Sequence, residues 1–508
     1  MNPAAIEAQD WIAYHALAAA EREAMHDLSS GRRFTYRDMD ARVSRAADYL
    51  RAGLGVREGQ RVAVLCHNDS DAFEIQFACR RLGAIFLPLN WRLSLPELDY
   101  ICRDAGPSAL LYGVEFSDVA ARLSQACAIP ATASMANGAD SDYERGIAGA
   151  GATLEPNSRK LDDVWTILYT SGTSGQPKGV LITYAMAHFN AVDCTTVGAL
   201  TSRSKNLVLL PMFHTGGLNV WANPVFHGGG CNVVMRTFEP ALLLECLADK
   251  ELGITHTLGV PTNYLMMAQE PRFADADLSH VSCLCVGGAA APEALLRRYF
   301  AKGVKLRAMY GMTEIGPLGL ALPEDKGLEK IGSSGLPAMH AGMKICRPDG
   351  TPAPRGEVGE LLIRGPSVTP GYWEKPRETA AAFDADGWFH TGDAARQDED
   401  GFFYIVDRWK DMFISGGENV YPIEVENAIY QLAGVLEAAV IGIPDDKWGE
   451  VGRAYVVPKD NAEIDGAAVI AHCRKLLARY KVPKEVRVVG QLPHNATGKI
   501  LKHELRRA

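Results

Sequence analysis

The 508-residue chain is long enough for about three domains, or for one large domain with a small companion. Its 52 Lys and Arg stand against 61 Asp and Glu, and the resulting net charge of −9 does not favour nucleic acid as the main partner. A hydrophobic content of 47% and a charged content of 22% exclude a disordered or collagen-like chain. We therefore expect a compact body with a sizeable core.

The eleven cysteines include no Cys-x-x-Cys pair, and Cys283 and Cys285 lie two apart inside an apolar segment. We interpret them as buried reduced thiols rather than as disulfides or metal ligands. The first residues have no cationic start followed by an apolar core, and no apolar run reaches the roughly eighteen residues of a membrane span. A cytoplasmic location without a transmembrane segment is expected, while peripheral membrane contact and a homodimer stay open.

Apolar strand-like segments alternate with helical ones in the first part of the chain. Residues 61–66 and 84–89 are predicted strands on either side of a helix at 71–83, which indicates parallel α/β layers. The Ala-, Gly- and Ser-rich stretch at 129–160 lacks hydrophobic periodicity, so we expect a surface connection there. Further strands are expected at 108–113, 164–169, 206–211, 231–235, 281–287 and 304–310.

From about residue 360 the pattern changes to shorter strands and turns, and a separate module is predicted after them. Its order is helix, strand, strand, helix, strand, at 423–433, 435–443, 451–458, 467–480 and 484–490. The predicted fold is α/β: a large N-terminal body with layered sheets and a β-rich part, plus a small mobile C-terminal α+β domain. The expected boundaries are 1–407 for the body, 408–410 for a hinge centred on Lys410, and 411–508 for the small domain.

The sharpest local signal is Tyr169-Thr-Ser-Gly-Thr-Ser-Gly-Gln-Pro-Lys-Gly179, which directly follows a predicted strand. Glycines and small hydroxyl residues leave N–H and O–H groups able to wrap a phosphate, and Lys178 supplies countercharge. The segment is not a Walker A loop, because Gly179 follows Lys178 where that motif has Ser or Thr. A plain flexible turn is the alternative, and the preceding strand and following lysine favour the phosphate loop.

This loop resembles that of the adenylate-forming enzymes, which comprise acyl-CoA synthetases, luciferases and the adenylation domains of peptide synthetases. Other motifs follow in that family's order, so the resemblance spans about residues 30 to 505. They are Met212-Phe-His-Thr-Gly-Gly217, Gly287-Gly-Ala289, Tyr310-Gly-Met-Thr-Glu314, Thr391-Gly-Asp393, Asp407-Arg-Trp-Lys-Asp411, Ser415-Gly-Gly-Glu-Asn419 and Thr497-Gly-Lys499.

Several motifs also have a physical interpretation of their own. The ring of Tyr310 can lie on a purine, Thr313 can donate to a phosphate oxygen, and Glu314 is a hard oxygen ligand suited to Mg²⁺. Asp393 can accept hydrogen bonds from both ribose hydroxyls, with Arg408 approaching from the domain boundary. Taken singly, each charged residue is better explained as a solvated surface group, and the order of the motifs reverses that preference.

Two further positions are ambiguous by themselves. Gly287 and Gly288 would let an adenine ring approach the backbone, but a strand-to-helix turn with Pro292 near the helix start explains them equally well. His214 lies among apolar residues, where a histidine is usually part of the core, and the resemblance places it beside the acyl group.

Lys499 and a Mg²⁺ on Glu314 are the candidates for the cation that the reaction needs. Attack of a carboxylate on a phosphate brings two anions together, so charge must be neutralised in the transition state. In the resembling family the matching lysine swings into the active site for that step, whereas a lysine so near a C-terminus would otherwise be solvated and inert.

The resemblance implies a full set of site residues. Catalytic roles are expected for Lys499, Glu314, Thr170, Lys178 and His214, and Mg²⁺ ligands for Glu314 and Thr170. ATP and AMP are expected at Thr170, Ser171, Gly172, Thr173, Ser174, Gly175, Lys178, Gly288, Ala289, Met309, Tyr310, Gly311, Met312, Thr313, Asp393, Ile405, Arg408 and Lys499. The acyl group is expected at His214, Thr215, Gly216 and Met312, and coenzyme A at Ser415, Gly416 and Gly417.

The implied activity is an AMP-forming ligation: a carboxylic acid and ATP give an acyl-adenylate, and coenzyme A then displaces AMP. A peptide-synthetase adenylation domain is the first alternative, but it would have an Asp near His214 and a carrier domain, whereas this chain ends nine residues after Lys499. A luciferase-like oxygenase shares most motifs, and a non-catalytic nucleotide sensor would not need Lys499. A free-standing acid–CoA ligase fits best.

The expected substrate is an apolar acid, either a medium- or long-chain fatty acid or an aryl or arylpropenoic acid such as ferulate. Residues 212–221 contain no Arg or Lys to neutralise a second carboxylate and no acid to hold an amine. A dicarboxylate would need a cation from elsewhere, and Arg236 is the nearest candidate. Gly216 and Gly217 would leave room for a ring or a chain, and Met309 could shorten the tunnel.

Overall fold

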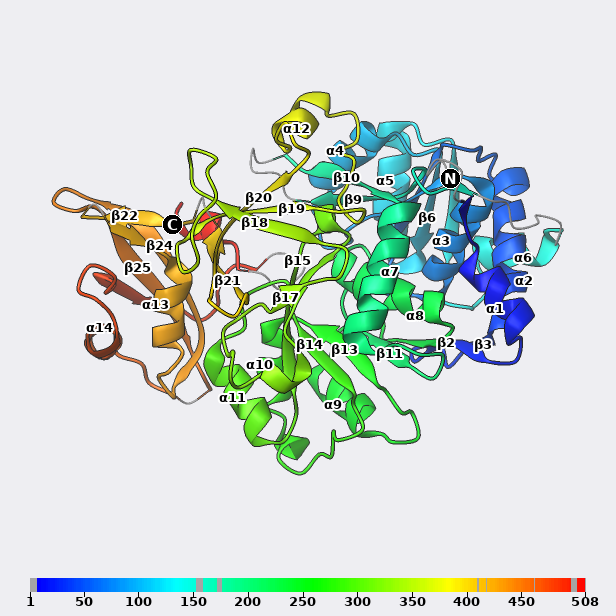
Figure 1. Cartoon of the computed structure of the whole chain (residues 1–508). Helices are drawn as coiled ribbons and strands as arrows, with labels where there is room; N and C mark the ends of the chain where they lie inside the picture. Colours follow the sequence, from blue (N-terminus) through cyan, green and yellow to red (C-terminus); the bar gives the residue numbers. More distant parts are fainter. Residues whose placement is uncertain are drawn as a thin grey trace.

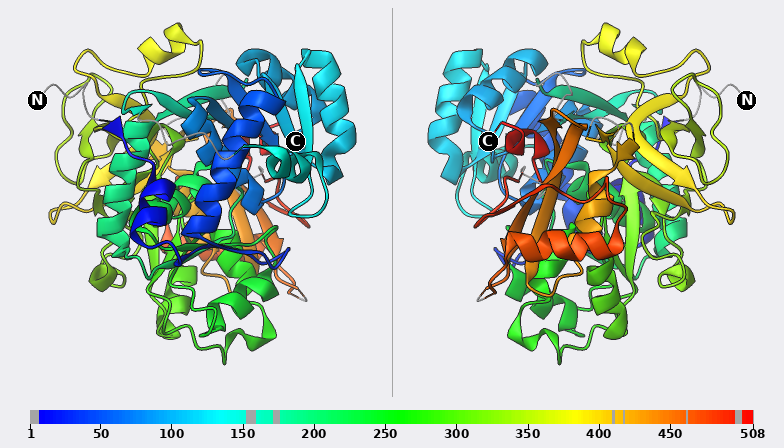
Figure 2. Two further views of the ribbon diagram at one scale, coloured as in Figure 1. Left: turned by 90° about the vertical axis from the view of Figure 1, so that its right-hand side faces the viewer. Right: turned by 90° about the vertical axis from the view of Figure 1, so that its left-hand side faces the viewer.

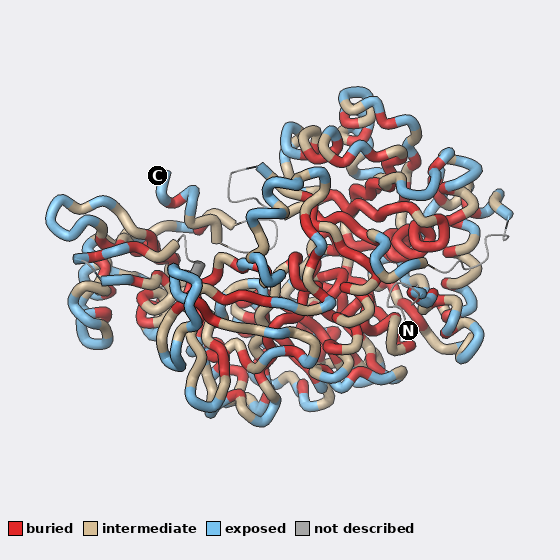
Figure 3. Tube along the Cα trace, turned by 45° about the horizontal axis from the view of Figure 1, so that its top comes forward, coloured by how far each residue is buried: buried red, intermediate tan, exposed pale blue. Residues whose placement is uncertain are grey.

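The chain is described by a computed structural model that covers residues 7–151, 159–170, 176–408, 411–416, 418–460, 462–494 and 500–507 (Figure 1). The elements up to Arg408 build a large body, and those from Phe413 onward form a smaller module at one side of it (Figures 1 and 2). Buried segments gather inside the large body, and exposed segments form its outer loops (Figure 3). Among the described residues, no helix combines the length and apolarity that crossing a membrane requires.

The first large sheet has six strands in the order β10-β9-β5-β4-β6-β7. All neighbours are parallel except β10, which runs antiparallel to β9. This confirms the parallel α/β layer predicted from residues 61–113. The strands are β4 (Arg61–Leu65), β5 (Ile85–Pro88), β6 (Ala109–Gly113), β7 (Ala131–Met135), β9 (Val164–Thr170) and β10 (Lys178–Thr183).

The helix between β4 and β5, α3 (Ser70–Leu82), is buried along its whole length. Its aromatic side chains contact both neighbouring layers: Phe77 lies 5.4 Å from Trp165 of β9, and Phe73 lies 5.3 Å from Phe226 of α8 (Ala222–Gly228), measured between ring centroids. Because a helix in this position has no solvent face, its charged residues are paired, as in the 2.6 Å contact of Glu74 with Arg42. This helix joins the two main sheets into one core.

The prediction of a surface connection at 129–160 is wrong for much of the described part of this range. Residues 131–135 form β7, which pairs in parallel with β6, and residues 142–149 form α6 (Asp142–Gly149), which buries Tyr143 and Ile147. Only two residues of β7 are buried, and its sequence contains a single β-branched residue, Thr132, of the kind that marks strands. Pairing with β6 therefore determines this strand, and residues 152–158 lie outside the described part.

The second large sheet has nine strands in the order β17-β16-β15-β14-β13-β11-β12-β2-β3. Its central strands are parallel, and Cys283 and Cys285 lie on one side of β14 with their Sγ atoms 3.5 Å apart. This confirms the interpretation of these cysteines as buried thiols. The strands are β2 (Glu23–Asp27), β3 (Arg33–Thr35), β11 (Lys205–Val208), β12 (Cys231–Val234), β13 (His256–Gly259), β14 (Cys283–Val286), β15 (Leu306–Gly311), β16 (Leu318–Ala321) and β17 (Leu336–Pro337).

Helices cover the two sheets, and a short antiparallel pair, β1 (Glu7–Ala8) with β8 (Arg159–Lys160), lies beside them. These helices are α1 (Trp11–Ala18), α2 (Tyr36–Asp48), α4 (Leu95–Ala105), α5 (Ser117–Cys127), α7 (Tyr184–Gly198), α9 (Pro240–Ala248), α10 (Pro261–Met267) and α11 (Glu293–Ala301).

The predicted β-rich part is a four-stranded antiparallel sheet, and the tail module follows it. The sheet comprises β18 (Gly342–Cys346), β19 (Gly359–Arg364), β20 (Phe389–Gln397) and β21 (Phe403–Arg408), with α12 (Pro376–Ala381) between β19 and β20. The module comprises β22 (Phe413–Ser415), β23 (Glu418–Val420), α13 (Pro422–Ile429), β24 (Val435–Asp445), β25 (Gly449–Pro458), α14 (Gly466–Leu476), β26 (Glu485–Val488) and α15 (Lys502–Leu505). The order α13-β24-β25-α14-β26 is as predicted, whereas β22, β23 and α15 are additional to the predicted elements. The 408–410 hinge falls between β21 and β22, and its role stays a prediction because Lys410 lies outside the described residues.

Candidate active site

A cavity of about 1270 Å³ opens where strands of both large sheets end, as expected for ligand sites of α/β sheets. Strand β9 ends at Thr170, β14 ends just before Gly287, and β15 ends at Gly311; these residues all line the cavity. The structure brings most of the expected site residues to its wall. They are Thr170, Lys178, His214, Thr215, Gly216, Gly288, Met309, Tyr310, Gly311, Met312, Thr313 and Glu314.

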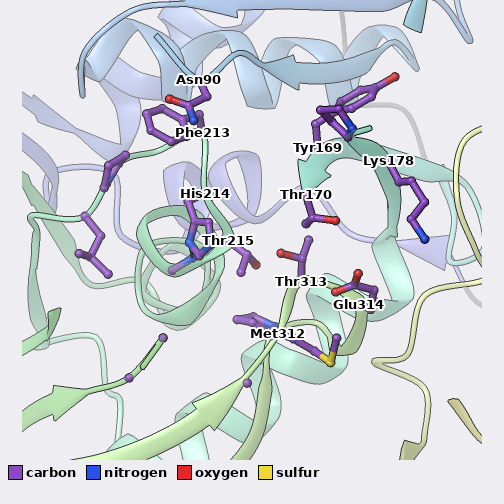
Figure 4. Close-up of a pocket in the computed structure, with 18 of the residues that line it drawn as sticks. Asn90, Tyr169, Thr170, Lys178, Phe213, His214, Thr215, Met312, Thr313 and Glu314 are labelled. Atoms are coloured by element: carbon purple, nitrogen blue, oxygen red, sulfur yellow. Dashed lines mark hydrogen bonds between the residues drawn. The ribbon is translucent and has the colours of Figure 1, made fainter. Parts of the chain in front are cut away.

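One side of the cavity carries the residues suited to phosphate. Thr170 and Lys178 are register partners on β9 and β10, so the two strands place a hydroxyl and an ammonium together. The Lys178 Nζ lies 4.6 Å from the ring centroid of Tyr372, and the Tyr372 hydroxyl donates to Glu314 Oε1 at 3.3 Å. Figure 4 shows Thr170, Thr313 and Glu314 pointing toward one another on this side. Ser171, Gly172, Thr173, Ser174 and Gly175 lie outside the described residues, and their role stays a prediction.

Glu314 has the surroundings of a carboxylate that meets a metal together with a nucleotide. Glu314 is only 7% exposed, yet it borders the cavity. The described residues contain no group of three or more His, Cys, Asp and Glu that would cage a metal. Mg²⁺ is usually held by one or two carboxylates plus substrate phosphates and waters, so a single carboxylate near Thr170 fits a Mg²⁺ that arrives with ATP.

The ribose side differs from the expectation in detail. Tyr310 borders the cavity, and its hydroxyl donates to Asp393 Oδ2 at 2.7 Å. Asp393 is buried and does not itself line the cavity, nor do Ala289 and Ile405. Asp393 and Arg408 are register partners on β20 and β21, which places their backbones side by side as predicted, but the Arg408 side chain is outside the description. Ribose binding by Asp393 therefore stays a prediction.

The glycines after β14 have a structural reason of their own. Gly288 has a φ of +76°, and a Cβ at Gly287 would stand 3.0 Å from the carbonyl oxygen of Met309. Pro292 then caps α11, so the strand-to-helix turn is confirmed. Approach of an adenine ring to this backbone is compatible with the turn, since both glycines line the cavity.

The other side of the cavity carries the expected acyl residues. His214 Nδ1 accepts a hydrogen bond from the Gly216 amide at 3.1 Å, so the neutral ring carries its proton on Nε2. Thr215 Oγ accepts from the side-chain amide of buried Asn219 at 3.2 Å, which leaves the hydroxyl proton able to donate elsewhere. His214 and Thr215 lie side by side across the cavity from Thr170 (Figure 4).

The prediction that Gly216 and Gly217 both leave room for the acyl group is wrong for Gly217. Gly216 borders the cavity, but Gly217 is buried, and a Cβ there would stand 2.4 Å from the carbonyl oxygens of Leu210 and Pro211. The residue is glycine because two backbone segments meet at that point. Leu218 is likewise fully buried core, whereas Val220 borders the cavity.

The structure also corrects the prediction that Arg236 is the nearest cation for a second carboxylate. Arg236 does not line the cavity; its guanidinium pairs with Glu115 and, at 3.5 Å, with Asp69. Arg92, which sequence reasoning missed, does line it and lies 4.7 Å over the Trp91 ring. The signal was available, because Arg92 follows strand β5 at the edge where the other strands deliver site residues.

The C-terminal module closes the cavity with the segment on either side of the predicted catalytic lysine. His494, Leu501, His503 and Glu504 all line it, while Lys499 itself lies outside the described residues. The expected coenzyme A residues Ser415 and Gly416 do not line it, and Gly417 lies outside the description. Gly416 has a φ of +62°, and a Cβ there would stand 2.7 Å from Trp448 Cε3, so this glycine has a local structural reason.

Comparison with known proteins places the chain among adenylating enzymes. Residues 12–373 match the model of the AMP-binding enzyme family, and residues 424–499 match the AMP-binding enzyme C-terminal domain. A feruloyl-CoA synthase of Amycolatopsis sp is 42% identical, covering 94% of each chain, and the long-chain-fatty-acid–CoA ligase FadD13 of Mycobacterium tuberculosis is 37% identical, covering 95% of each. The ATP-bound structure of MatB from Rhodopseudomonas palustris superposes with a TM-score of 0.91 at 31% identity, covering 99% of each chain.

Proposed function

Because the chain belongs to the AMP-binding enzyme family, we propose that it is an AMP-forming carboxylic acid–CoA ligase. The observation that carries this is one cavity with two unlike sides. A hydroxyl, an ammonium and a carboxylate suited to ATP and Mg²⁺ face a largely apolar side headed by His214 and Thr215. The relatives that are CoA synthases or ligases match over nearly their whole length, which supports transfer to coenzyme A rather than to a carrier protein.

In the first step, the acid carboxylate must reach the α-phosphate of ATP. Lys178 and Thr170 would orient the phosphates, and Mg²⁺, when bound, neutralises their developing charge. Thr215 can donate its hydroxyl proton to the acyl oxygen, since Asn219 occupies an acceptor lone pair of that hydroxyl. Lys499 would supply the remaining cation from the segment that borders the cavity.

In the second step, the thiol of coenzyme A attacks the acyl-adenylate and AMP leaves. Ser415, Gly416 and Gly417 would contact the coenzyme A arm only after the module turns, because the first two do not line the cavity in this arrangement. His494 and Leu501, on either side of Lys499 in the sequence, face the cavity here, which suits the adenylation step. Lys410 is our candidate for the hinge.

We further propose that the acid is apolar, either aryl or aliphatic. The acyl side is bordered by Leu210, Phe213, Val220, Leu258, Val260 and Leu318. A charged distal group would be desolvated there, at a cost of several kcal/mol if unpaired. The feruloyl and long-chain relatives support both substrate classes. A cytoplasmic location and a homodimer stay predictions.

The proposed function is tested by pyrophosphate release across octanoate, palmitate, benzoate, ferulate and malonate, with and without coenzyme A. We expect an apolar acid to be preferred, with thioester formed only when coenzyme A is present. A clear preference for malonate would overturn the substrate proposal. If that preference disappeared in Arg92→Leu, Arg92 would be the cation that binds the second carboxylate. Absence of pyrophosphate release with every acid would count against the adenylating activity itself.

The role of Lys499 is tested by separating the half-reactions. Lys499→Ala should lower adenylation about a hundred- to a thousandfold and largely spare thioester formation from supplied acyl-adenylate, because only the first step joins two anions. Lys475→Ala, at an exposed lysine on α14, is the matched control and should leave both steps unchanged. An equal loss of both half-reactions in Lys499→Ala would contradict the assignment.

A further inference from the structure

A second cavity, of about 320 Å³, lies apart from the active site and shares no lining residue with it. Trp165 of β9 lines this cavity, whereas Thr170 at the other end of the same strand lines the active site, so the two cavities are separated by about 17 Å of strand. Its volume is at the lower end of the range for small-molecule sites, roughly 300–1000 Å³. The residues that line it are Glu7, Ala8, Gln9, Trp11, Tyr14, His15, Arg80, Leu161, Trp165, Tyr184, His188 and His227.

The walls of this second cavity, called the rear cavity below, are rich in aromatic rings. Trp165 and Tyr184 are stacked, with ring centroids 5.4 Å apart and an interplanar angle of 22°. Trp11 stands edge-on to Trp165 at 5.6 Å and to His227 at 5.2 Å. Such rings offer both faces and edges to a further aromatic ring, which favours a planar ligand over a branched one.

A buried hydroxyl in this cavity has no partner among the described residues. Tyr184 is only 4% exposed, and its Oη has no hydrogen-bond partner there although the side chain lines the cavity. An unpaired buried hydroxyl destabilises the fold, so such groups in folded proteins are nearly always satisfied by water, a ligand or another protein group. A ligand oxygen that accepts from Tyr184 would satisfy it.

The charges around the cavity favour an uncharged ligand. Burial lowers the pKa of His15, His188 and His227, in His227 to about 4, so all three imidazoles are neutral at pH 7. The one guanidinium, that of Arg80, already lies 3.3 Å from the carboxylate of Asp10. A carboxylate ligand would therefore lose its hydration without meeting an uncompensated cation.

A neutral imidazole can also accept a hydrogen bond from a ligand. The rings of His188 and His227 lie 5.4 Å apart and both line the cavity. A ligand hydroxyl can accept a hydrogen bond from Tyr184 and has a proton of its own to donate to an imidazole of the cavity wall. A phenolic hydroxyl on a planar ring has this combination.

We propose that the rear cavity is a binding site for an uncharged monocyclic phenol, whose ring packs among Trp11, Trp165 and His227 and whose oxygen accepts from Tyr184. The proposal does not depend on the ligase activity, because the cavity has its own walls and its own polar groups. It adds a non-catalytic ligand site to the chain.

The test is fluorine NMR with 4-fluorophenol as the probe, on full-length protein whose active site is saturated with a non-reactive acyl-adenylate analogue. We expect saturable binding of 4-fluorophenol and at least tenfold weaker binding of 4-fluorobenzoate. Leu161→Trp, which fills the cavity, should abolish the bound signal. No binding of 4-fluorophenol, or equal binding of 4-fluorobenzoate, would overturn the proposal.

A matched pair of variants tests the role of the hydroxyl. Tyr184→Phe keeps the ring stack and should weaken 4-fluorophenol about three- to tenfold, the value of one hydrogen bond. Tyr480→Phe is the control, since Tyr480 of the C-terminal module lines neither cavity, and the affinity for 4-fluorophenol should stay unchanged in it. Tyr184→Phe should not lower the thermal midpoint of the free protein, because no protein bond is lost among the described contacts. Unchanged affinity in Tyr184→Phe would refute the assigned hydrogen bond.

Discussion

Two adjacent glycines, Gly216 and Gly217, allow a sharp test of how the acyl side is built. In Gly217→Ala the new Cβ would stand 2.4 Å from two backbone carbonyl oxygens, about 0.6 Å inside the 3.0 Å limit that real Cβ atoms keep. Backbone cannot rotate away as a side chain does, so the turn itself must move. Overpacking of this kind costs about 1–3 kcal/mol.

Movement of this turn would also lower the reaction rate. The turn carries His214 and Thr215, and a displacement approaching 1 Å of positioned groups lowers rates by up to about a hundredfold. In Gly216→Ala the new Cβ would instead meet side-chain atoms, Leu210 Cδ1 at 3.1 Å and His214 Nδ1 at 3.3 Å, which can yield. We expect this variant to lose less than about 1 kcal/mol of stability, and its methyl group should lower kcat/KM for the bulkier acids about tenfold.

The assay is the urea midpoint of each variant together with kcat/KM for benzoate, ferulate and palmitate. Gly217→Ala should lower the midpoint and reduce activity with every acid alike, whereas Gly216→Ala should keep the midpoint and change the ranking of acids. A Gly217→Ala protein as stable and active as wild type would refute the packing argument. Equal destabilisation by both substitutions would refute the distinction between core and cavity wall.

Three further predictions concern the metal, the hinge and a pH-dependent pair. Glu314→Gln should raise the Mg²⁺ concentration needed for half-maximal adenylation. Tyr372→Phe removes only the hydrogen bond to Glu314 and should raise that concentration less. An unchanged Mg²⁺ requirement in Glu314→Gln would exclude Glu314 as a metal ligand. Lys410→Pro should damage thioester formation far more than adenylation, as measured by the separate half-reactions, because proline restricts φ at the hinge; parallel loss would indicate misfolding instead. The hydrogen bond between His494 and Glu437, at 3.1 Å, raises the pKa of His494 in the folded protein. The pair therefore contributes its full stabilisation at pH values below the histidine pKa of the unfolded chain. This contribution is lost as the pH rises through the pKa of His494 in the folded protein. The difference in unfolding free energy between wild type and His494→Gln should thus shrink from pH 5.5 to 8.5, and a constant difference would refute the linkage.

The sequence by itself determined the kind of chemistry and much of the framework. The motif residues Thr170, Tyr310 and Glu314 lie at or just after the ends of strand-like segments, and the carboxyl ends of parallel strands meet at one edge of a sheet. Their convergence on one cavity could therefore be predicted from local patterns. The helix and strand order of the C-terminal module was predictable for the same reason, since periodicity depends on residues only a few positions apart.

Tertiary structure alone decided which of several suitable residues meet the cavity. Gly216 and Gly217 are identical in sequence terms, and only the approach of the Leu210 and Pro211 carbonyls makes one of them a packing residue. Arg92 rather than Arg236 borders the cavity, because the latter is held by carboxylates far away in the chain. The short strand β7 forms only because β6 offers a free edge. The Arg236 ion pairs and the β6–β7 pairing join segments far apart in the chain, and the Gly217 contact depends on the path of the turn after β11; none of these leaves a signal in the local sequence pattern.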